Sequence, residues 1–390
     1  MSYPLIRPKS NRKYQICSCC VMDTTDEDIV FDANGVCMRC NEYKKRIEPD
    51  WNHGKGHEKE LKELIINIKK SGKCRKYDCI LGLSGGLDSS YMLHMAVKEW
   101  GLRPFVFHID CGWNLPVAEK NIKRLSKGLG GLKVHTKKMD WEEMRQMQLA
   151  WFRTGLESLD APQDHAFIAL IDEYSRKLGV KYILNGYNIA TEIIADPAAW
   201  GRGAGPTGDS TYMKDVIRKY CDIPIKNYRF TNGFKHKFWI PYVLGVKTVK
   251  PLNLIPITKK QMIDTLVAEY GYEPYGQKHF EDLITKFLEG WWSPTRFGHD
   301  IRRAQLSSLV VTGQMSRDEA LKILQEPSIS EEESKVLISE VASRLGITEE
   351  SLKVFHEMPE CSERFRSQVF FYQWGIRLYE VLGLEKRIRK

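Results

Sequence analysis

The sequence predicts an α/β protein built on a parallel five-stranded sheet, with a small zinc-ribbon domain before the sheet and a helical domain after it. Between residues 77 and 275, strand-like apolar runs alternate with amphipathic helices, which is typical of parallel sheets. Two CxxC pairs precede this region, and the strand pattern disappears from Gln277 onward. We therefore expect a zinc ribbon at 1–50, a linker helix at 51–76, the sheet domain at 77–275 and the helical domain at 276–390.

Composition and charge are those of a globular protein. Of the 390 residues, 42% are hydrophobic and 28% are charged, which is too apolar for a disordered chain. The net charge of +9 suits an anionic ligand without requiring nucleic acid. No run of about 18 apolar residues predicts a membrane span, and the first fifteen residues lack the apolar centre of a signal peptide. We therefore expect a cytoplasmic protein.

Five of the ten cysteines lie between Cys17 and Cys40. Cys17 and Cys20 form one CxxC pair, and Cys37 and Cys40 form a second, which is the spacing of a tetrahedral zinc site. Cys19 lies inside the first pair and is an alternative ligand to Cys17. Because a segment of about forty residues has too little core to fold unaided, a structural zinc site explains the cluster better than buried free thiols do.

A glycine-rich turn joins the first predicted strand, residues 77–83, to a helix. The turn reads Ser-Gly-Gly-Leu-Asp-Ser-Ser from Ser84 to Ser90. It aims backbone N–H groups and the positive end of the helix at one point, which is how proteins hold phosphate oxygens, and Asp88 is placed to bind Mg²⁺. The Lys of a Walker loop and the GxGxxG pattern are both absent. The alternative is a glycine turn without a ligand.

Four further strands complete the predicted sheet, at 103–110, 132–136, 180–185 and 249–256. Helices are expected at 116–130, 163–178 and 258–270. Since ligands bind at the carboxyl ends of parallel strands, the site should be lined by the loops 84–90, 108–113, 136–141 and 186–192.

Arginines outside the sheet are candidate substrate ligands. Arg202 lies in a long glycine-rich loop between the fourth and fifth strands, where it could meet a phosphate or carboxylate or could simply be a surface residue. A second group of arginines follows Trp291 and Trp292, and such a concentration of aromatic residues and arginines is not required on the surface of a helix. It comprises Arg296, Arg302 and Arg303. Arginine makes paired hydrogen bonds to diphosphate and carboxylate groups, so we expect these side chains at a substrate.

The turn from Ser84 to Ser89 resembles the SGGxDS loop of the PP-loop ATP-pyrophosphatases, enzymes that split ATP between the α and β phosphates and adenylate a substrate oxygen. The resemblance implies the fold of the adenine nucleotide alpha-hydrolases, with ATP and Mg²⁺ as cofactors. It assigns nucleotide binding to Ser84, Gly85, Gly86, Asp88, Ser89 and Ser90, to the main chain of His108, Ile109 and Asp110, and to Gly186.

The same resemblance makes Asp88, Lys259 and Glu192 the candidate catalytic residues. Lys259 occupies the place where several of these enzymes carry a phosphate-binding lysine, and Glu192 is a possible Mg²⁺ ligand. Both are equally well explained as solvated residues in the first turn of a helix. His108 is more often a packed residue than a catalyst at such a strand end.

Three segments together look like the N-acetyl sugar amidotransferases of the PseA and WbpG type. They are the zinc-ribbon sequence from Ile16 to Thr25, the SGGLDSS loop, and the run RFGHDIRRAQLSS that begins at Arg296. The resemblance implies that an acetamido group on a nucleotide-linked bacterial surface sugar becomes an acetamidino group, in flagellin-glycan or lipopolysaccharide O-antigen synthesis. It also implies a separate glutaminase of the imidazole-glycerol-phosphate synthase type as the ammonia source, with or without a cyclase-like subunit.

Two other readings remain open at this point. A tRNA-thiolating PP-loop enzyme also joins CxxC pairs to this loop, but its chemistry needs cysteines or an iron–sulfur cluster beside ATP, and Cys111 and Cys221 each stand alone. A zinc-ribbon nucleic-acid-binding module with a degenerate nucleotide fold is the second alternative, which the intact loop and the modest charge disfavour.

Overall fold

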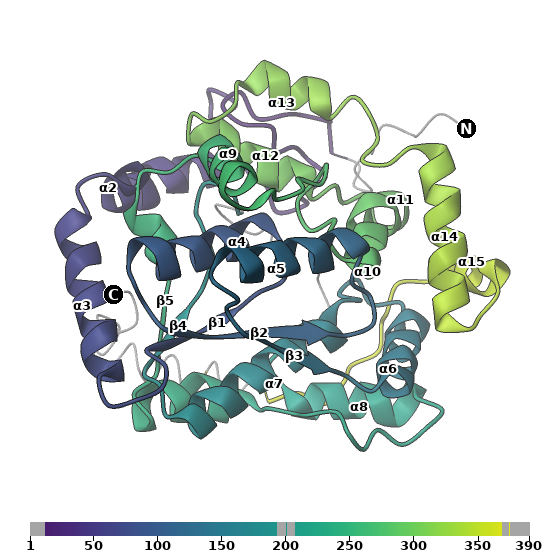
Figure 1. Ribbon diagram of the computed structural model, residues 1–390. Coiled ribbons are helices and arrows are strands. Elements are labelled where there is room, and N and C mark those ends of the chain that lie inside the picture. The colour runs from purple at the N-terminus through teal and green to yellow at the C-terminus, as the bar shows by residue number, and fades with distance from the viewer. Residues whose placement is uncertain (1–11, 193–199, 201–206, 369–373, 375–390) are drawn as a thin grey trace.

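The computed structural model describes residues 12–192, 200, 207–368 and 374. Its centre is a sheet of five parallel strands in the order β3-β2-β1-β4-β5, as Figure 1 shows. The strands are β1 (Cys79–Gly82), β2 (Pro104–Asp110), β3 (Val134–Lys138), β4 (Tyr182–Leu184) and β5 (Lys247–Val249). The predicted α/β class with a parallel five-stranded sheet is confirmed.

Helices cover both faces of this sheet (Figure 1). On one face lie α4 (Leu87–His94), α5 (Pro116–Gly128) and α9 (Lys259–Tyr270), which contact one another, and on the other lies α7 (Ala161–Leu178). Buried side chains of Leu81, Val106 and Leu184 face the first layer, whereas Ile80, Phe107 and Ile183 face α7. This alternation along each strand is the reason that the strand segments are apolar throughout.

The chain enters the sheet domain through a series of short helices. They are α1 (Met38–Glu42), the π-helix η1 (Tyr43–Ile47), α2 (Glu48–Trp51), the 3₁₀-helix η2 (Asn52–Gly54) and α3 (Glu58–Gly72). Ile65 and Ile68 of α3 are buried in the same core as the helices on the first face of the sheet. The N-terminal segment is thereby joined to the sheet domain by packing.

Helices are the only regular secondary structure in the described chain from 283 to 368. They are α10 (Leu283–Phe287), the π-helix η6 (Leu288–Trp292), α11 (Ser293–Arg296), α12 (Arg302–Val311), α13 (Arg317–Ile323), α14 (Glu331–Leu345) and α15 (Glu349–Glu357). Phe287 and Leu345 share one core with Trp151 of α6 (Trp141–Thr154) and Met213 of α8 (Ser210–Tyr220). The helical region and the sheet domain therefore bury their apolar surfaces against each other.

The fifth strand is shorter than the sequence predicts and lies earlier in the chain, so the predicted range of 249–256 is wrong. β5 ends at Val249, and residues 251–254 form the 3₁₀-helix η5 (Pro251–Leu254) instead of continuing the strand. Proline has no N–H to donate to the sheet, so the ladder stops before Pro251. Leu252 remains buried, but it packs in the core that α3 also joins. No helix in the described part of the chain is long and apolar enough to cross a membrane.

Candidate active site

A cavity of about 720 Å³ lies at the carboxyl edge of the sheet. Its walls come from the loops after β1, β2 and β4, the first turns of α7, and the segment 272–289 that leads into the helical domain. A volume of this size accommodates a nucleotide together with a second ligand. The cavity lies where the strand pattern predicts a site.

The loop after β1 requires its glycines. Gly85 has φ +88°, and a Cβ there would lie 2.6 Å from the carbonyl oxygen of Ala118. A Cβ on Gly86 would lie 2.3 Å from Oε1 of Glu281. The loop is closed by its own hydroxyls, since the N–H of Gly86 donates to Ser84 Oγ at 3.1 Å. Such a backbone turn at the start of α4 can bind phosphate oxygens.

Of the predicted loop residues, Ser84, Gly86, Asp88 and Ser89 line the cavity. Gly85 and Ser90 do not line it: Ser90 is fully buried, and Gly85 lies against α5. Gly186 also lines the cavity, and a Cβ added there would be 2.9 Å from the carbonyl oxygen of Asp88. The β4 loop and the start of α4 therefore approach each other at backbone distance.

Lys278, a residue that the sequence analysis missed, forms ion pairs with both predicted catalytic carboxylates, Asp88 and Glu192. Its Nζ lies 2.8 Å from Asp88 Oδ2 and 2.7 Å from Glu192 Oε1. The Thr191 hydroxyl donates to the other oxygen of Asp88 at 2.7 Å. Burial lowers the pKa of Lys278, but the charges of the two carboxylates outweigh it and raise the pKa, so Lys278 is a cation.

Lys259 is the first residue of α9 and also lines the cavity. Its side chain is partly buried, and this burial, with the positive charge of Lys278, lowers its pKa. Its backbone N–H donates to Gln314 Oε1 of the helical region at 2.8 Å. Lys259 and Glu192 thus both face the cavity, unlike ordinary solvated residues of a first helical turn.

His108 lies in the cavity wall with both ring nitrogens engaged. Nδ1 donates to the carbonyl oxygen of Leu83 at 2.8 Å, which leaves Nε2 to accept from the Asn114 amide at 2.9 Å. The geometry is that of a packed imidazole. Ile109 also lines the cavity, whereas Asp110 is not among its lining residues and accepts from the N–H of Gly112.

Another part of the cavity wall carries several acidic side chains. Desolvation in the cavity raises the pKa of Asp164 to about 8, helped by the charge of Asp160. The pKa of Asp282 rises to about 6 for the same reason. His279 is held cationic, because the charge of Glu289, 2.8 Å away, outweighs burial and raises its pKa to about 9. The polar run from Gln277 to Asp282 was the available signal.

The predicted arginines do not meet in the cavity. Arg202 lies outside the described residues. Arg302 pairs with Asp300 at 2.7 Å, and Arg303 pairs with Asp23 at 3.0 Å. Arg296 donates to main-chain oxygens near the end of α15. The structure thus gives the last three arginines partners within the protein and places none of them among the lining residues.

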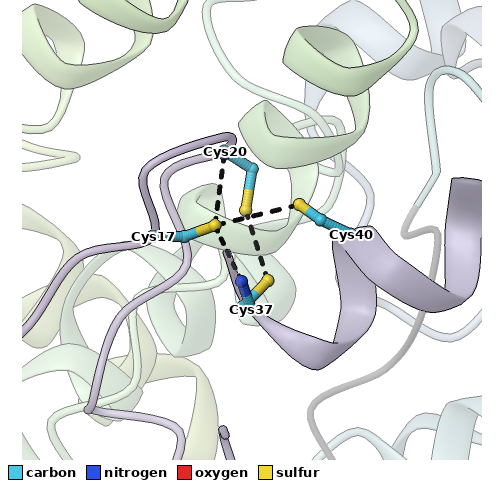
Figure 2. A group of neighbouring side chains, drawn as sticks. All are labelled: Cys17, Cys20, Cys37 and Cys40. Atoms are coloured by element: carbon cyan, nitrogen blue, oxygen red, sulfur yellow. Dashed lines mark hydrogen bonds between the residues drawn. The ribbon is translucent and has the colours of Figure 1, made fainter. Parts of the chain in front are cut away.

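Four buried cysteines form a second site, shown in Figure 2. The Sγ atoms of Cys17, Cys20, Cys37 and Cys40 all lie within 4.8 Å of one another, with Cys17 to Cys40 at 3.9 Å and Cys20 to Cys37 at 3.7 Å. Ligands about 2.3 Å from a tetrahedral zinc ion stand about 3.8 Å apart. The cluster could therefore hold a metal such as zinc, and Cys19 lies outside it.

The surroundings of the cluster support thiolate ligands and tie it to the helical region. Three backbone N–H groups, including that of Cys37 at 3.2 Å, point at Cys17 Sγ. Arg317 of α13 donates to the carbonyl oxygens of Cys17 and Cys20. The N–H of Val21 donates to the Ser307 hydroxyl of α12. The helical region thus holds the first CxxC pair of the cluster in place.

Comparisons with known proteins agree with this organisation. Residues 281–379 match the family model of the "LPS biosynthesis protein WbpG-like, C-terminal domain". A curated relative, the "Uncharacterized protein MJ1599" of Methanocaldococcus jannaschii, is 23% identical over 322 residues, which cover 81% of this chain and 95% of that protein. The matched C-terminal segment supplies Glu281 and Asp282 to the cavity. This match supports the resemblance of the chain to WbpG-type proteins that its sequence motifs indicate.

Proposed function

We propose that the protein is an ATP-dependent amidotransferase that converts an acetamido group of a nucleotide-linked surface sugar into an acetamidino group. One observation carries the proposal: the phosphate loop and the WbpG-like segment face the same cavity and touch. The Ser84 hydroxyl donates to Glu281 Oε1 at 3.3 Å. Just before the matched segment, the Tyr275 hydroxyl accepts from the N–H of Leu87 at 3.2 Å. The family match supports a role in lipopolysaccharide biosynthesis.

The residues of the cavity suit Mg-ATP. The loop amides, Lys259 and Lys278 offer donors and positive charge to a triphosphate. Asp88 and Glu192 offer carboxylate oxygens, the ligands that Mg²⁺ prefers. Magnesium would supply neutralisation of phosphate charge. Both carboxylates pair with the single ammonium group of Lys278 in this structure, which leaves an excess of negative charge for a cation.

The chemistry follows from the weakness of an amide as an electrophile. The amide oxygen attacks the α-phosphorus of ATP, the bond to the β-phosphate oxygen breaks, and pyrophosphate leaves into the loop at 84–90. Ammonia then attacks the carbon of the O-adenylyl imidate, the C–O bond breaks, and AMP leaves. The products are an amidine, AMP and pyrophosphate. Positioning and charge neutralisation carry such a transfer, so no nucleophilic side chain is required.

Ammonia must reach the cavity in a nucleophilic form. We propose that it comes from a partner glutaminase of the imidazole-glycerol-phosphate synthase type, as the family resemblance implies. Asp282 lines the cavity and has a pKa raised to about 6, so near pH 7 it is mostly a carboxylate that could take up a proton from ammonium.

The cysteines give no support to the thiolating alternative. Cys111 lines the cavity, but burial raises the pKa of its thiol, which opposes formation of a thiolate. Cys221 is not among the lining residues. Within the described chain, Cys111 therefore has no second cysteine beside it at the cavity.

The test incubates the protein with Mg-ATP, an ammonium salt and UDP- or CMP-linked diacetamido sugars, and follows AMP, pyrophosphate and sugar mass. Replacing the amide oxygen by NH makes the sugar lighter by about one dalton, a change that hydrolysis cannot mimic. We expect sugar-dependent AMP release coupled to this change. AMP release without it would disprove the amidination, and no AMP even with a glutaminase partner and a wider sugar panel would disprove the adenylation.

A matched pair of variants shows whether the activity belongs to the cavity. Lys259→Met should abolish sugar-dependent AMP release. Lys260→Met, its neighbour on the exposed side of α9, which pairs only with Asp264 at 2.6 Å, should retain it. Equal activity of the two variants would contradict the assignment of Lys259 to the phosphates.

A further inference from the structure

A row of exposed aromatic side chains stands on the π-helix η4 (Lys235–Val243). We call it the aromatic stripe; its members are Phe234, Phe238, Trp239, Tyr242 and Val243, which are 58, 43, 44, 40 and 50% exposed. Three of them form a ladder, with ring centroids 5.1 Å apart for Phe234 and Phe238 and 5.6 Å apart for Phe238 and Tyr242. Contiguous exposed apolar surface of this kind marks an interaction site in many proteins.

The helix that carries the stripe is fixed on its other side. Ile240 is 4% exposed and belongs to the core between the sheet and α7. His236 Nδ1 lies 2.9 Å from Asp172 Oδ1, a buried carboxylate of α7. The stripe therefore faces outward from a helix that is packed and hydrogen-bonded on its inner side, so its exposure is part of the fold.

The surrounding chain is strongly basic. From Ile223 to Ile263 the sequence contains no Asp or Glu and eight Lys or Arg residues. Lys237, Lys247 and Arg229 are exposed near the stripe in the sequence. The acidic residues that α7 presents nearby already have partners, since Asp172 pairs with His236 and Glu173 with Lys177. The chain on both sides of the stripe therefore carries exposed basic residues and no acidic ones.

We propose that the aromatic stripe and its lysines dock the protein on an anionic lipid bilayer. Phe, Trp and Tyr rings insert at the headgroup level of a membrane, and lysines beside them are attracted to anionic lipids. A protein partner fits the composition less well, because lysine is depleted from protein–protein interfaces. The chain's own C-terminal residues 369–390 carry five Lys or Arg against two Glu, so their charge does not complement the face.

The placement has a consequence for the cavity. His236 of η4 and Thr248 of β5 both line it, so the cavity lies directly behind the stripe. A protein docked through the stripe would hold its active site next to the bilayer surface. The proposal stands independently of the reaction, since it rests on the exposed residues alone.

The experiment is flotation of the full-length protein with vesicles of phosphatidylcholine, with and without phosphatidylglycerol. We expect binding to the anionic vesicles that weakens as salt rises. Phe238→Ser/Trp239→Ser and Lys237→Glu/Lys247→Glu should each lower the affinity about tenfold or more. Trp239→Phe should still bind and should lose part of the tryptophan quenching by brominated lipid, which places residue 239 in the bilayer.

Two control variants match these changes elsewhere. Val336→Ser/Val354→Ser alters exposed apolar residues of α14 and α15, and Lys322→Glu/Lys353→Glu makes the same charge change on α13 and α15. Both should bind vesicles as the wild type does, and circular dichroism should show all variants folded. Equal binding to neutral and anionic vesicles, or full binding by Phe238→Ser/Trp239→Ser, would overturn the proposal. A third result would also overturn it: the wild type fails to bind vesicles but self-associates, and Phe238→Ser/Trp239→Ser abolishes that self-association. The stripe would then be a protein interface.

Discussion

The ammonium group of Lys278 lies 2.8 Å from the carboxylate of Asp88, although the two residues are 190 positions apart. Asp88 belongs to the loop that begins α4, whereas Lys278 precedes the helical region. Both side chains are largely buried, with 13 and 15% of their surfaces exposed. The contact therefore fixes the C-terminal part of the protein against the phosphate loop and sets the charge of the cavity.

Loss of Lys278 should disable the site. Lys278→Met leaves Asp88 and Glu192 facing each other without a counter-charge, so we expect sugar-dependent AMP release to fall at least about 100-fold. Lys278→Arg keeps the charge and should retain part of the activity. Lys286→Met breaks a comparable ion pair outside the cavity, with Glu333, and should keep full activity. If Lys286→Met lost as much activity as Lys278→Met, the loss in both variants would reflect reduced protein stability and not a role of Lys278 at the site.

The close approach between the loop and Glu281 gives a second prediction. A methyl group at Gly86 would lie 2.3 Å from Glu281 Oε1 and 2.9 Å from the Tyr275 hydroxyl. Gly86→Ala should therefore weaken ATP binding, measured by calorimetry, about tenfold or more. The double variant Gly86→Ala/Glu281→Ala removes the clashing carboxylate and should regain affinity. Gly276→Ala, where a Cβ meets nothing within 4 Å, should bind as the wild type does.

The cysteine cluster should hold one metal ion per chain and stabilise the protein. Cys37→Ser removes a ligand, so we expect loss of the ion by elemental analysis and a melting temperature lower by about 5–10 °C. Cys19→Ser and Cys74→Ser lie outside the cluster and should retain the metal. Metal retained in Cys17→Ser but lost in Cys19→Ser would instead favour Cys19 as a ligand in place of Cys17.

The sequence identified the elements whose signals are local. The strands, the glycine loop and the cysteine spacing depend on neighbouring residues, so the sheet and the four-cysteine cluster were predictable. The stop before Pro251 is also a local signal, because proline lacks an N–H, whereas the apolar run after it favours the longer strand that the structure does not have.

The side chains that meet in the cavity come from distant parts of the sequence. Lys278 and Glu281 reach the loop from almost 200 residues away, and no local pattern distinguishes them from other charged residues. One member of the arginine run also has a distant partner. Arg303 finds Asp23 across 280 positions, and that partner explains the arginine without any ligand.

The packing of α15 should make stability depend on pH. His356 stacks on Trp291 with ring centroids 4.7 Å apart, and burial, aided by the charge of Arg296, lowers its pKa from 6.5 to about 4. Between these values the unfolded chain binds a proton that the folded protein does not. The free energy of unfolding should therefore fall as the pH drops through this window, by roughly 2 kcal/mol from this residue.

The measurement is chemical denaturation between pH 4 and pH 7.5. His356→Phe keeps an aromatic ring against Trp291 but cannot be protonated, so its loss of stability toward low pH should be smaller than that of the wild type by about this amount. Thr295→Ala removes the hydroxyl 2.8 Å from His356 Nε2 and leaves the imidazole in place. It should lower stability while keeping the wild-type dependence on pH. An identical dependence in His356→Phe would show that the acid sensitivity arises elsewhere, and that α15 does not sense pH through this ring.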